Sequence, residues 1–284
     1  MLNVIKMELY RLVHAKSFYV TAAVCAGIIM LLVMLTAALM NIVSNIPATD
    51  MTVSGGDTSI GMTVSATDDS DASGTISPIS FCSPLISGLC GIFVVIFTAI
   101  FVYGFYKDGY SKNVIACVKY RWYFQVSKAV CIAVYTAFIL MVTSVASIIT
   151  SAICLTSFGL EYMGVFFQYL LGEFFLLNAI GLLSAFLTEL TYSKVTSIVY
   201  ILLASTSLIR GLLSLLEDKL SEIFKTTVEL WKLFPSLYQG SFSLSAPDTS
   251  GNGAMFTRAI VLSVLFIAIY NAAGGLLITK RDMK

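Results

Sequence analysis

Six long apolar stretches alternate with polar segments along the 284-residue chain. A helix needs about 20 predominantly apolar residues to cross the hydrocarbon core of a bilayer, and each stretch is at least that long. The pattern predicts an all-α integral membrane protein with a single transmembrane domain over 1–284. The first stretch is too long for a signal peptide and lacks a small-residue cleavage site, so we interpret it as a retained span. The predicted spans are 17–42, 84–106, 128–156, 165–187, 195–216 and 258–279.

The composition supports lipid, not water, as the main solvent. Hydrophobic residues make up 58% of the chain and charged residues 12%, against roughly 45–50% and about 25% in soluble proteins. A net charge of +1 provides no basic face, so we expect no nucleic-acid partner. The six cysteines are unclustered and His14 is the single histidine. This pattern favours packing cysteines and argues against a metal site or an enzyme that uses histidine.

The basic residues predict the orientation. Six spans put both termini on one side, together with 107–127 and Lys194. That side carries most of the 17 Lys and Arg residues, whereas 43–83 and 157–164 contain none. The positive-inside rule therefore predicts a multi-pass protein of the cell membrane with both termini in the cytoplasm. The exceptions lie within or border the fifth-to-sixth connection: Arg210, Lys219, Lys225, Lys232 and Arg258.

Residues 2–16 have the spacing of an amphipathic helix. Ile5, Leu9 and Leu12 fall on one face, while Arg11 falls largely on another. This pattern predicts a helix that lies on the cytoplasmic leaflet before the first span. The alternative is a charged N-terminus that only obeys the topology rule.

Two segments are predicted to lie outside the cell. Residues 43–83 carry five acids and no basic residue, which favours a solvated loop; a cation or capture site at Asp68, Asp69 and Asp71 is the alternative. In 217–257, apolar residues recur at helical spacing up to Phe234 and Pro235 follows. We interpret this segment as an external amphipathic helix that Pro235 ends, followed by a Gly/Ser-rich loop over 239–254.

Three polar residues within the predicted spans are candidate functional groups. Glu173 would lie roughly 12 Å and Arg210 about 9 Å from the external face, at 1.5 Å per residue. Their similar depth on consecutive spans predicts an ion pair, because an unpaired charge there is costly. The alternatives are a role in lining a substrate path, or an Arg210 side chain that extends outward to the interface. Asn178 is predicted to form an interhelical hydrogen bond.

The connection after the second span is basic and aromatic. Over 107–127 the sequence reads KDGYSKNVIACVKYRWYFQVS, and a short exposed helix is predicted near 113–120. This is the best candidate surface for a soluble partner. The chain contains no GxxxxGK[ST] phosphate loop, so it is not expected to hydrolyse ATP by itself.

The order of these features resembles the ABC-2 type permease family, the membrane subunits of type V ABC exporters. Lys107–Asn113, followed by Arg121 and Lys128, is similar to that family's "E-x-x-x-G-T-x-K-N … S-R-x-x-F/Y … K" stretch, although Asp108 and Ser111 depart from it. The tail Thr279–Asp282 is similar to the family's "F-x-x-R/K-D" ending. The long 43–83 loop resembles the permeases of peptide-antibiotic immunity and toxin-peptide exporters.

The resemblance implies a transport subunit, not an enzyme. A separate cytoplasmic ATPase would bind ATP and Mg, with no cofactor in this chain. The permease would act as a homodimer or with a homologous permease, in a path for a peptide or other amphipathic compound. By the same resemblance, the ATPase-coupling residues would be Lys112, Asn113, Val114, Val118 and Arg121.

Two other classes of function stay open. A secondary transporter or channel would need no ATPase, but no hydropathy repeat relates the two halves and Glu173 is the only clear deep acid. An intramembrane enzyme would need general acid–base groups, and the spans contain no histidine and no paired carboxylates.

Overall fold

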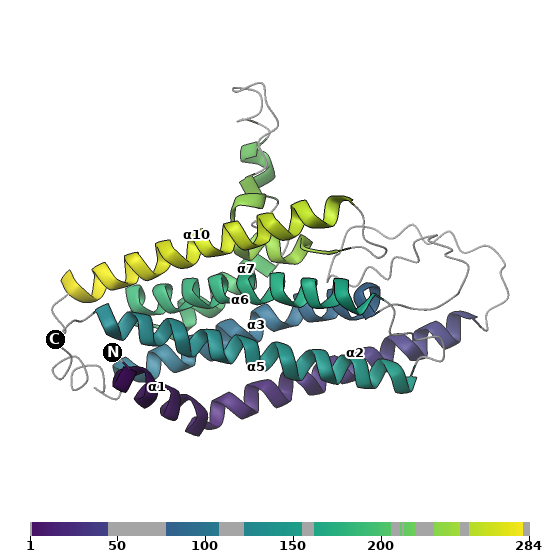
Figure 1. The fold of residues 1–284 in the computed structure, drawn as a ribbon, viewed down its shortest axis with the longest axis horizontal. Coiled ribbons are helices and arrows are strands. Elements are labelled where there is room, and N and C mark those ends of the chain that lie inside the picture. Colours follow the sequence, from purple (N-terminus) through teal and green to yellow (C-terminus); the bar gives the residue numbers. More distant parts are fainter. Residues whose placement is uncertain are drawn as a thin grey trace.

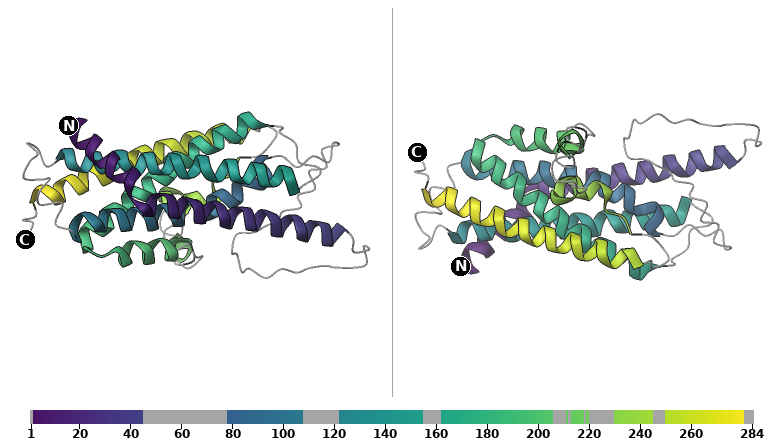
Figure 2. Two further views of the ribbon diagram at one scale, coloured as in Figure 1. Left: turned by 90° about the horizontal axis from the view of Figure 1, so that it is seen from below. Right: turned by 90° about the horizontal axis from the view of Figure 1, so that it is seen from above.

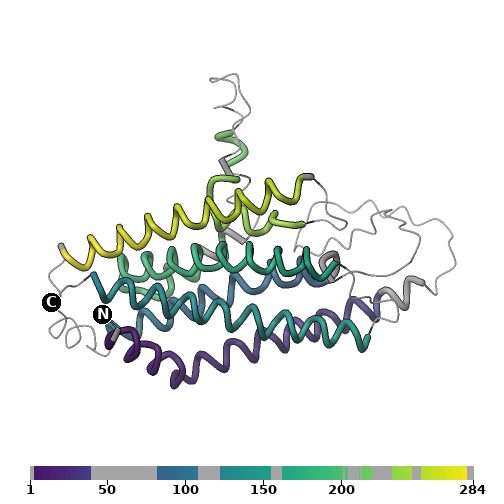
Figure 3. Tube along the Cα trace, in the orientation of Figure 1, coloured from purple at the N-terminus to yellow at the C-terminus, as the bar shows by residue number. Residues whose placement is uncertain are grey.

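The computed structural model describes residues 2–44, 78–107, 122–154, 162–205, 211, 213–217, 219, 230–244 and 250–280. Every regular element in these ranges is helical, and Figure 3 traces them in colour. The long helices are α1 (Leu2–His14), α2 (Lys16–Ser44), α3 (Pro78–Lys107), α5 (Trp122–Cys154), α6 (Met163–Thr191), α7 (Lys194–Ser205) and α10 (Ser250–Lys280). Shorter elements are η1 (Leu230–Leu233), α9 (Pro235–Tyr238) and η2 (Gln239–Ser241).

The protein is an all-α, multi-pass membrane protein. Within the described residues, 5 helices are long and apolar enough to cross a bilayer: α2, α3, α5, α6 and α10. They run side by side, with α2 and α10 on opposite flanks of α3, α5 and α6 (Figure 1). The outer faces carry exposed apolar side chains such as Leu31, Met141 and Val261. A bilayer accommodates such a surface, because exposing this much apolar area to water would be unfavourable.

The fifth predicted span differs from the other five. Of residues 195–216, a continuous helix is described only as far as Ser205, where α7 ends after 12 residues. Such a helix covers about 18 Å, which is short of the roughly 30 Å hydrocarbon core. Further along this interval, residues 213–217 are helical again. The count of six spans therefore stays a prediction.

Several helices begin earlier than the hydropathy pattern predicts. The third helix of the chain begins at Pro78 instead of residue 84, the next long one at Trp122 instead of 128, and the last at Ser250 instead of 258. The early turns contain Ser, Gln and Gly, which lower the hydropathy but can extend a helix at the bilayer boundary. Proline at the first position of a helix is favourable, because its missing N–H would be unpaired there in any case.

The ends of the helices bring distant segments together. The helix α1, the ends of α3, α6 and α10, and the start of α5 lie at the same end of the bundle (Figures 1 and 2). We refer to it as the terminal end. There, a Cβ added at Gly274 or Gly275 would lie 2.4 Å from Gln125 or 2.1 Å from Trp122. These glycines thus permit the close approach of α10 to α5.

Aromatic rings form the centre of the core. Phe97 of α3 stacks on Tyr135 of α5, with ring centroids 3.7 Å apart, and Phe18 of α2 packs edge-on against both. The Tyr135 hydroxyl lies 2.9 Å from the Thr21 hydroxyl, so its polar atom is partnered inside the core. This cluster fixes α2, α3 and α5 against each other.

Candidate functional site

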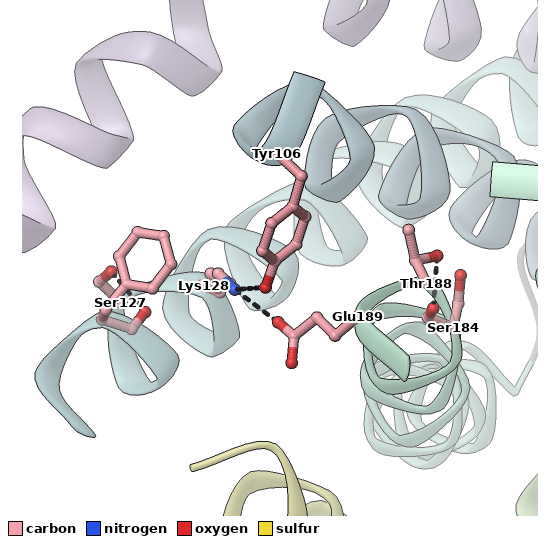
Figure 4. A network of polar contacts seen from close by, with 7 residues as sticks. Tyr106, Ser127, Lys128, Ser184, Thr188 and Glu189 are labelled. Carbon is pink, nitrogen blue, oxygen red and sulfur yellow. Dashed lines mark hydrogen bonds and ion pairs between the residues drawn. The ribbon is translucent and has the colours of Figure 1, made fainter. Parts of the chain in front are cut away.

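A buried ion pair lies near the terminal end of the bundle (Figure 4). Lys128 of α5 donates from Nζ to Oε1 of Glu189 on α6 at 2.5 Å, and the two side chains are 0% and 2% exposed. The same Nζ donates to the Tyr106 hydroxyl of α3 at 3.4 Å. The pair therefore joins three helices. Charges this deeply buried persist only when they are paired and hydrogen-bonded.

Aromatic rings complete the surroundings of the Lys128 ammonium. Its Nζ lies 4.3 Å from the centroid of Phe124, 5.3 Å from Tyr106 and 5.5 Å from Phe105. Phe124 precedes Lys128 by four residues, so helical geometry places both on one face of α5. Cation–π attraction at such distances adds to the ion pair when the site is dry.

The N-terminal helix α1 packs on this same end through charged side chains. The Arg11 guanidinium lies 3.9 Å from the centroid of Phe105 and 5.3 Å from that of Phe101. Glu8 and Leu12 are fully buried, while Ile5 and Leu9 are half-buried. A helix over Leu2–His14 is confirmed, whereas its place on the cytoplasmic leaflet stays a prediction. The assignment of Arg11 to a separate polar face is wrong. A guanidinium is weakly hydrated and stacks well on aromatic rings, so it can join a buried face.

The predicted ATPase-coupling residues lie outside the described residues: Lys112, Asn113, Val114, Val118 and Arg121. Their segment is bounded by Lys107 at the end of α3 and Trp122 at the start of α5. Both boundaries lie beside the ion pair, since Tyr106 and Phe124 contact Lys128. The acidic residues Asp68, Asp69 and Asp71 also lie outside the described residues, so the capture-site alternative stays a prediction.

A second polar cluster lies deeper along the bundle, around Glu173. This side chain is fully buried on α6. Gln239 donates from Nε2 to Glu173 Oε1 at 2.6 Å and to the Ser87 carbonyl of α3 at 3.0 Å. Arg210, the predicted partner of Glu173, lies outside the described residues, so that ion pair stays a prediction.

Gln239 belongs to a short segment that enters the bundle. We define the re-entrant segment as 235–244, which comprises α9, η2 and the three residues that follow. Leu237 packs with Val95 and Ile180, midway along α3 and α6. Phe242 stacks against Tyr169 with ring centroids 5.5 Å apart. These contacts place the segment between the helices.

The position of the re-entrant segment corrects one prediction for 217–257 and leaves another open. Pro235 begins α9, since proline fits the first turn of a helix. The helical turn before it, η1, ends at Leu233, and most of the predicted external helix lies outside the described residues, so its end at Pro235 stays a prediction. The loop predicted over 239–254 is partly core, because Gln239, Phe242 and Leu244 are buried. Residues 220–229, which carry much of the predicted amphipathic pattern, lie outside the described residues.

Asn178 is placed differently from its prediction. It is buried, but its Nδ2 donates to the Phe174 carbonyl of its own helix at 3.3 Å. Asn271 does the same with Ile267 at 2.9 Å. Bonding to the carbonyl four residues earlier satisfies a donor without help from a second helix. The predicted interhelical hydrogen bond of Asn178 is therefore replaced by an intrahelical one.

No protein-family model matches the chain, and no curated protein matches it.

Proposed function

We propose that this chain is the membrane-spanning permease subunit of an ATP-driven ABC exporter of type V. It would form the path for a peptide or other amphipathic compound through the cell membrane. A separate cytoplasmic ATPase would bind ATP and Mg. Two permease chains, identical or homologous, would complete the transporter, as the resemblance of the 107–128 stretch and the tail implies.

The observation that carries the proposal is the construction of the terminal end. The Lys128–Glu189 pair ties α5 to α6 directly after the candidate coupling segment, and Tyr106 ties in α3 directly before it. A force applied to that segment would therefore reach three helices at once. Packed side chains and hydrogen-bonded networks of this kind carry coupling between sites, and an ATPase docked at this end would supply the force.

A secondary transporter or channel is the second candidate, and Glu173 favours it. A carboxylate buried among membrane helices is a common feature of proton- and ion-coupled transport. This reading needs no ATPase and predicts flux by this chain alone.

Co-purification with an ATPase encoded beside this chain tests the proposal. The full chain should recover the ATPase, and ATP hydrolysis in vesicles should require both proteins. Replacing Val114 and Val118 with aspartate should abolish recovery, because charge would disrupt an apolar docking surface. The matched control is the same change at Val53 and Val64 in the predicted external loop.

Two outcomes would contradict the exporter. One is ATPase recovery that is equal in both double variants. The other is proton- or sodium-driven flux by the purified chain alone, which would establish the second candidate instead. Membrane-impermeant labelling of cysteines added at each terminus checks the orientation independently, and we expect neither terminus to react from outside the cell.

A further inference from the structure

The re-entrant segment packs between α3 and α6, and we refer to the surface that it covers, around Gly91, Gly172 and Glu173, as the groove. A Cβ added at Gly91 of α3 would lie 2.7 Å from Gln239 Oε1, and one at Gly172 of α6 would lie 2.5 Å from Phe242 Cζ. Both glycines thus let a side chain of the segment rest directly on a helix. The groove thus accommodates the amide of Gln239 beside the aromatic ring of Phe242.

Glu173 lies in this groove, and only one of its two carboxylate oxygens accepts a hydrogen bond from the described residues. Oε1 accepts the bond from Gln239, whereas Oε2 has no hydrogen-bond partner among the described residues. The neighbouring titratable groups are already engaged: Tyr169 donates to the Ser83 carbonyl at 2.9 Å, and the Cys90 thiol lies 3.5 Å from the Thr143 hydroxyl. A fully buried carboxylate oxygen without a donor is costly. The site therefore favours a ligand that brings donors and positive charge.

We propose that the groove between α3 and α6 is a binding site for a positively charged group of the transported compound, with Glu173 as its anionic contact. The re-entrant segment occupies this site in the absence of cargo, and the Gln239–Glu173 hydrogen bond acts as the latch. This inference rests on the proposed transport function and names the chemistry of its cargo.

The hydrogen bonds made by Gln239 indicate which ligand group could take its place. The Gln239 amide nitrogen bridges the Glu173 carboxylate and the Ser87 carbonyl. An ammonium group carries three donors and a full charge, so it can satisfy both of these acceptors and also Glu173 Oε2. The place of Phe242 on Gly172 is suited to an apolar or aromatic neighbour of that ammonium. The expected ligand is thus an amphipathic peptide in which a lysine adjoins an aromatic residue.

Binding of two fluorescent peptides to the full chain in phosphatidylcholine nanodiscs tests the site. The probes are acetyl-Phe-Lys-Phe amide and its counterpart with norleucine in place of lysine, measured by fluorescence anisotropy. The Gln239→Ala variant lacks the latch. It should bind the lysine peptide with an affinity at least about ten times that for the norleucine peptide, as expected for a charged hydrogen bond. In Glu173→Gln/Gln239→Ala this preference should vanish. Gly240→Ala is the matched control, since Gly240 is exposed and a Cβ there meets nothing within 4 Å.

Equal binding of both peptides to Gln239→Ala would overturn the proposal, and it is the result expected if Arg210 already neutralises Glu173. A preference that persists without Glu173 would also overturn it. If Gln239→Ala does not fold, Gln239→Asn replaces it, because its shorter amide cannot bridge both acceptors; no preference there refutes the site. The assay contains no ATPase, so loss of the charge preference with intact ATPase recovery rejects this inference alone.

Discussion

Replacing Lys128 with methionine removes a buried charge while it keeps a side chain of similar length. At a separation of 2.5 Å, the attraction to Glu189 is about 7 kcal/mol for an effective dielectric constant of about 20. Burial of the two ions costs several kcal/mol each, so the intact pair is close to balance. The Lys128→Met variant keeps the cost of burying Glu189 and loses the attraction. We expect it to destabilise the protein by about 3–5 kcal/mol.

The buried cysteines provide the assay. Cys25, Cys82, Cys90 and Cys131 are free and buried, so a thiol-reactive fluorescent dye reports unfolding in detergent as these side chains become accessible. The midpoint for Lys128→Met should fall well below that of the unaltered protein. Lys6→Met is the control, because Lys6 is exposed on α1.

A double variant separates the ion pair from simple packing. Lys128→Met/Glu189→Met removes both charges and replaces them with apolar groups of similar volume. We expect its midpoint to return close to that of the unaltered protein, since replacing a buried pair by apolar residues is often neutral or stabilising. The reasoning fails if the double variant is as unstable as Lys128→Met, or if Lys128→Met matches Lys6→Met.

Two further substitutions test other contacts with the same dye assay. Gly172→Ala should destabilise the protein by about 1–3 kcal/mol, because the new methyl group would overlap the buried Phe242 ring; Gly164→Ala, where a Cβ meets nothing within 4 Å, should have little effect. Arg11→Gln should loosen α1 by about 1–2 kcal/mol, because it removes the cation above Phe105. A smaller effect of Arg11→Gln than of Arg11→Lys would contradict the stacking argument, since lysine keeps the charge.

The sequence predicted the long helices because lipid-facing and core-facing residues are both apolar, so hydropathy alone detects them. It did not predict the Lys128–Glu189 pair. Lys128 lay at the predicted start of its span, 128–156, and Glu189 lay just beyond the predicted end of the following span, 165–187, where charges normally reach the interface. The one local signal is Phe124, four residues before Lys128 on the same helical face. The pairing itself joins residues 61 positions apart.

The re-entrant segment was missed for a different physical reason. Its apolar residues Leu237, Phe242 and Leu244 are few and have glycine and serine among them. Such a composition is typical of an exposed loop. These residues are buried by packing against α3 and α6, and such tertiary contacts cannot be predicted from the local spacing of apolar residues. Gln239 is functional in our proposal only because the fold brings it to Glu173. In contrast, the sequence predicted α1 as a helix, but it did not predict which face of α1 packs against the bundle.

The large outward-facing surface of α10 has a consequence for how this protein can change over generations. Only 17% of its most apolar stretch is buried, and the side that faces the protein includes Ala259, Gly274 and Gly275. Fatty acyl chains are fluid and impose no shape, so positions such as Val261 and Leu265 can exchange freely among apolar residues. The two glycines cannot enlarge without pushing the helix off its neighbour. Among related sequences, the lipid-facing side of α10 should therefore vary freely among apolar residues, whereas its protein-facing side should hardly vary.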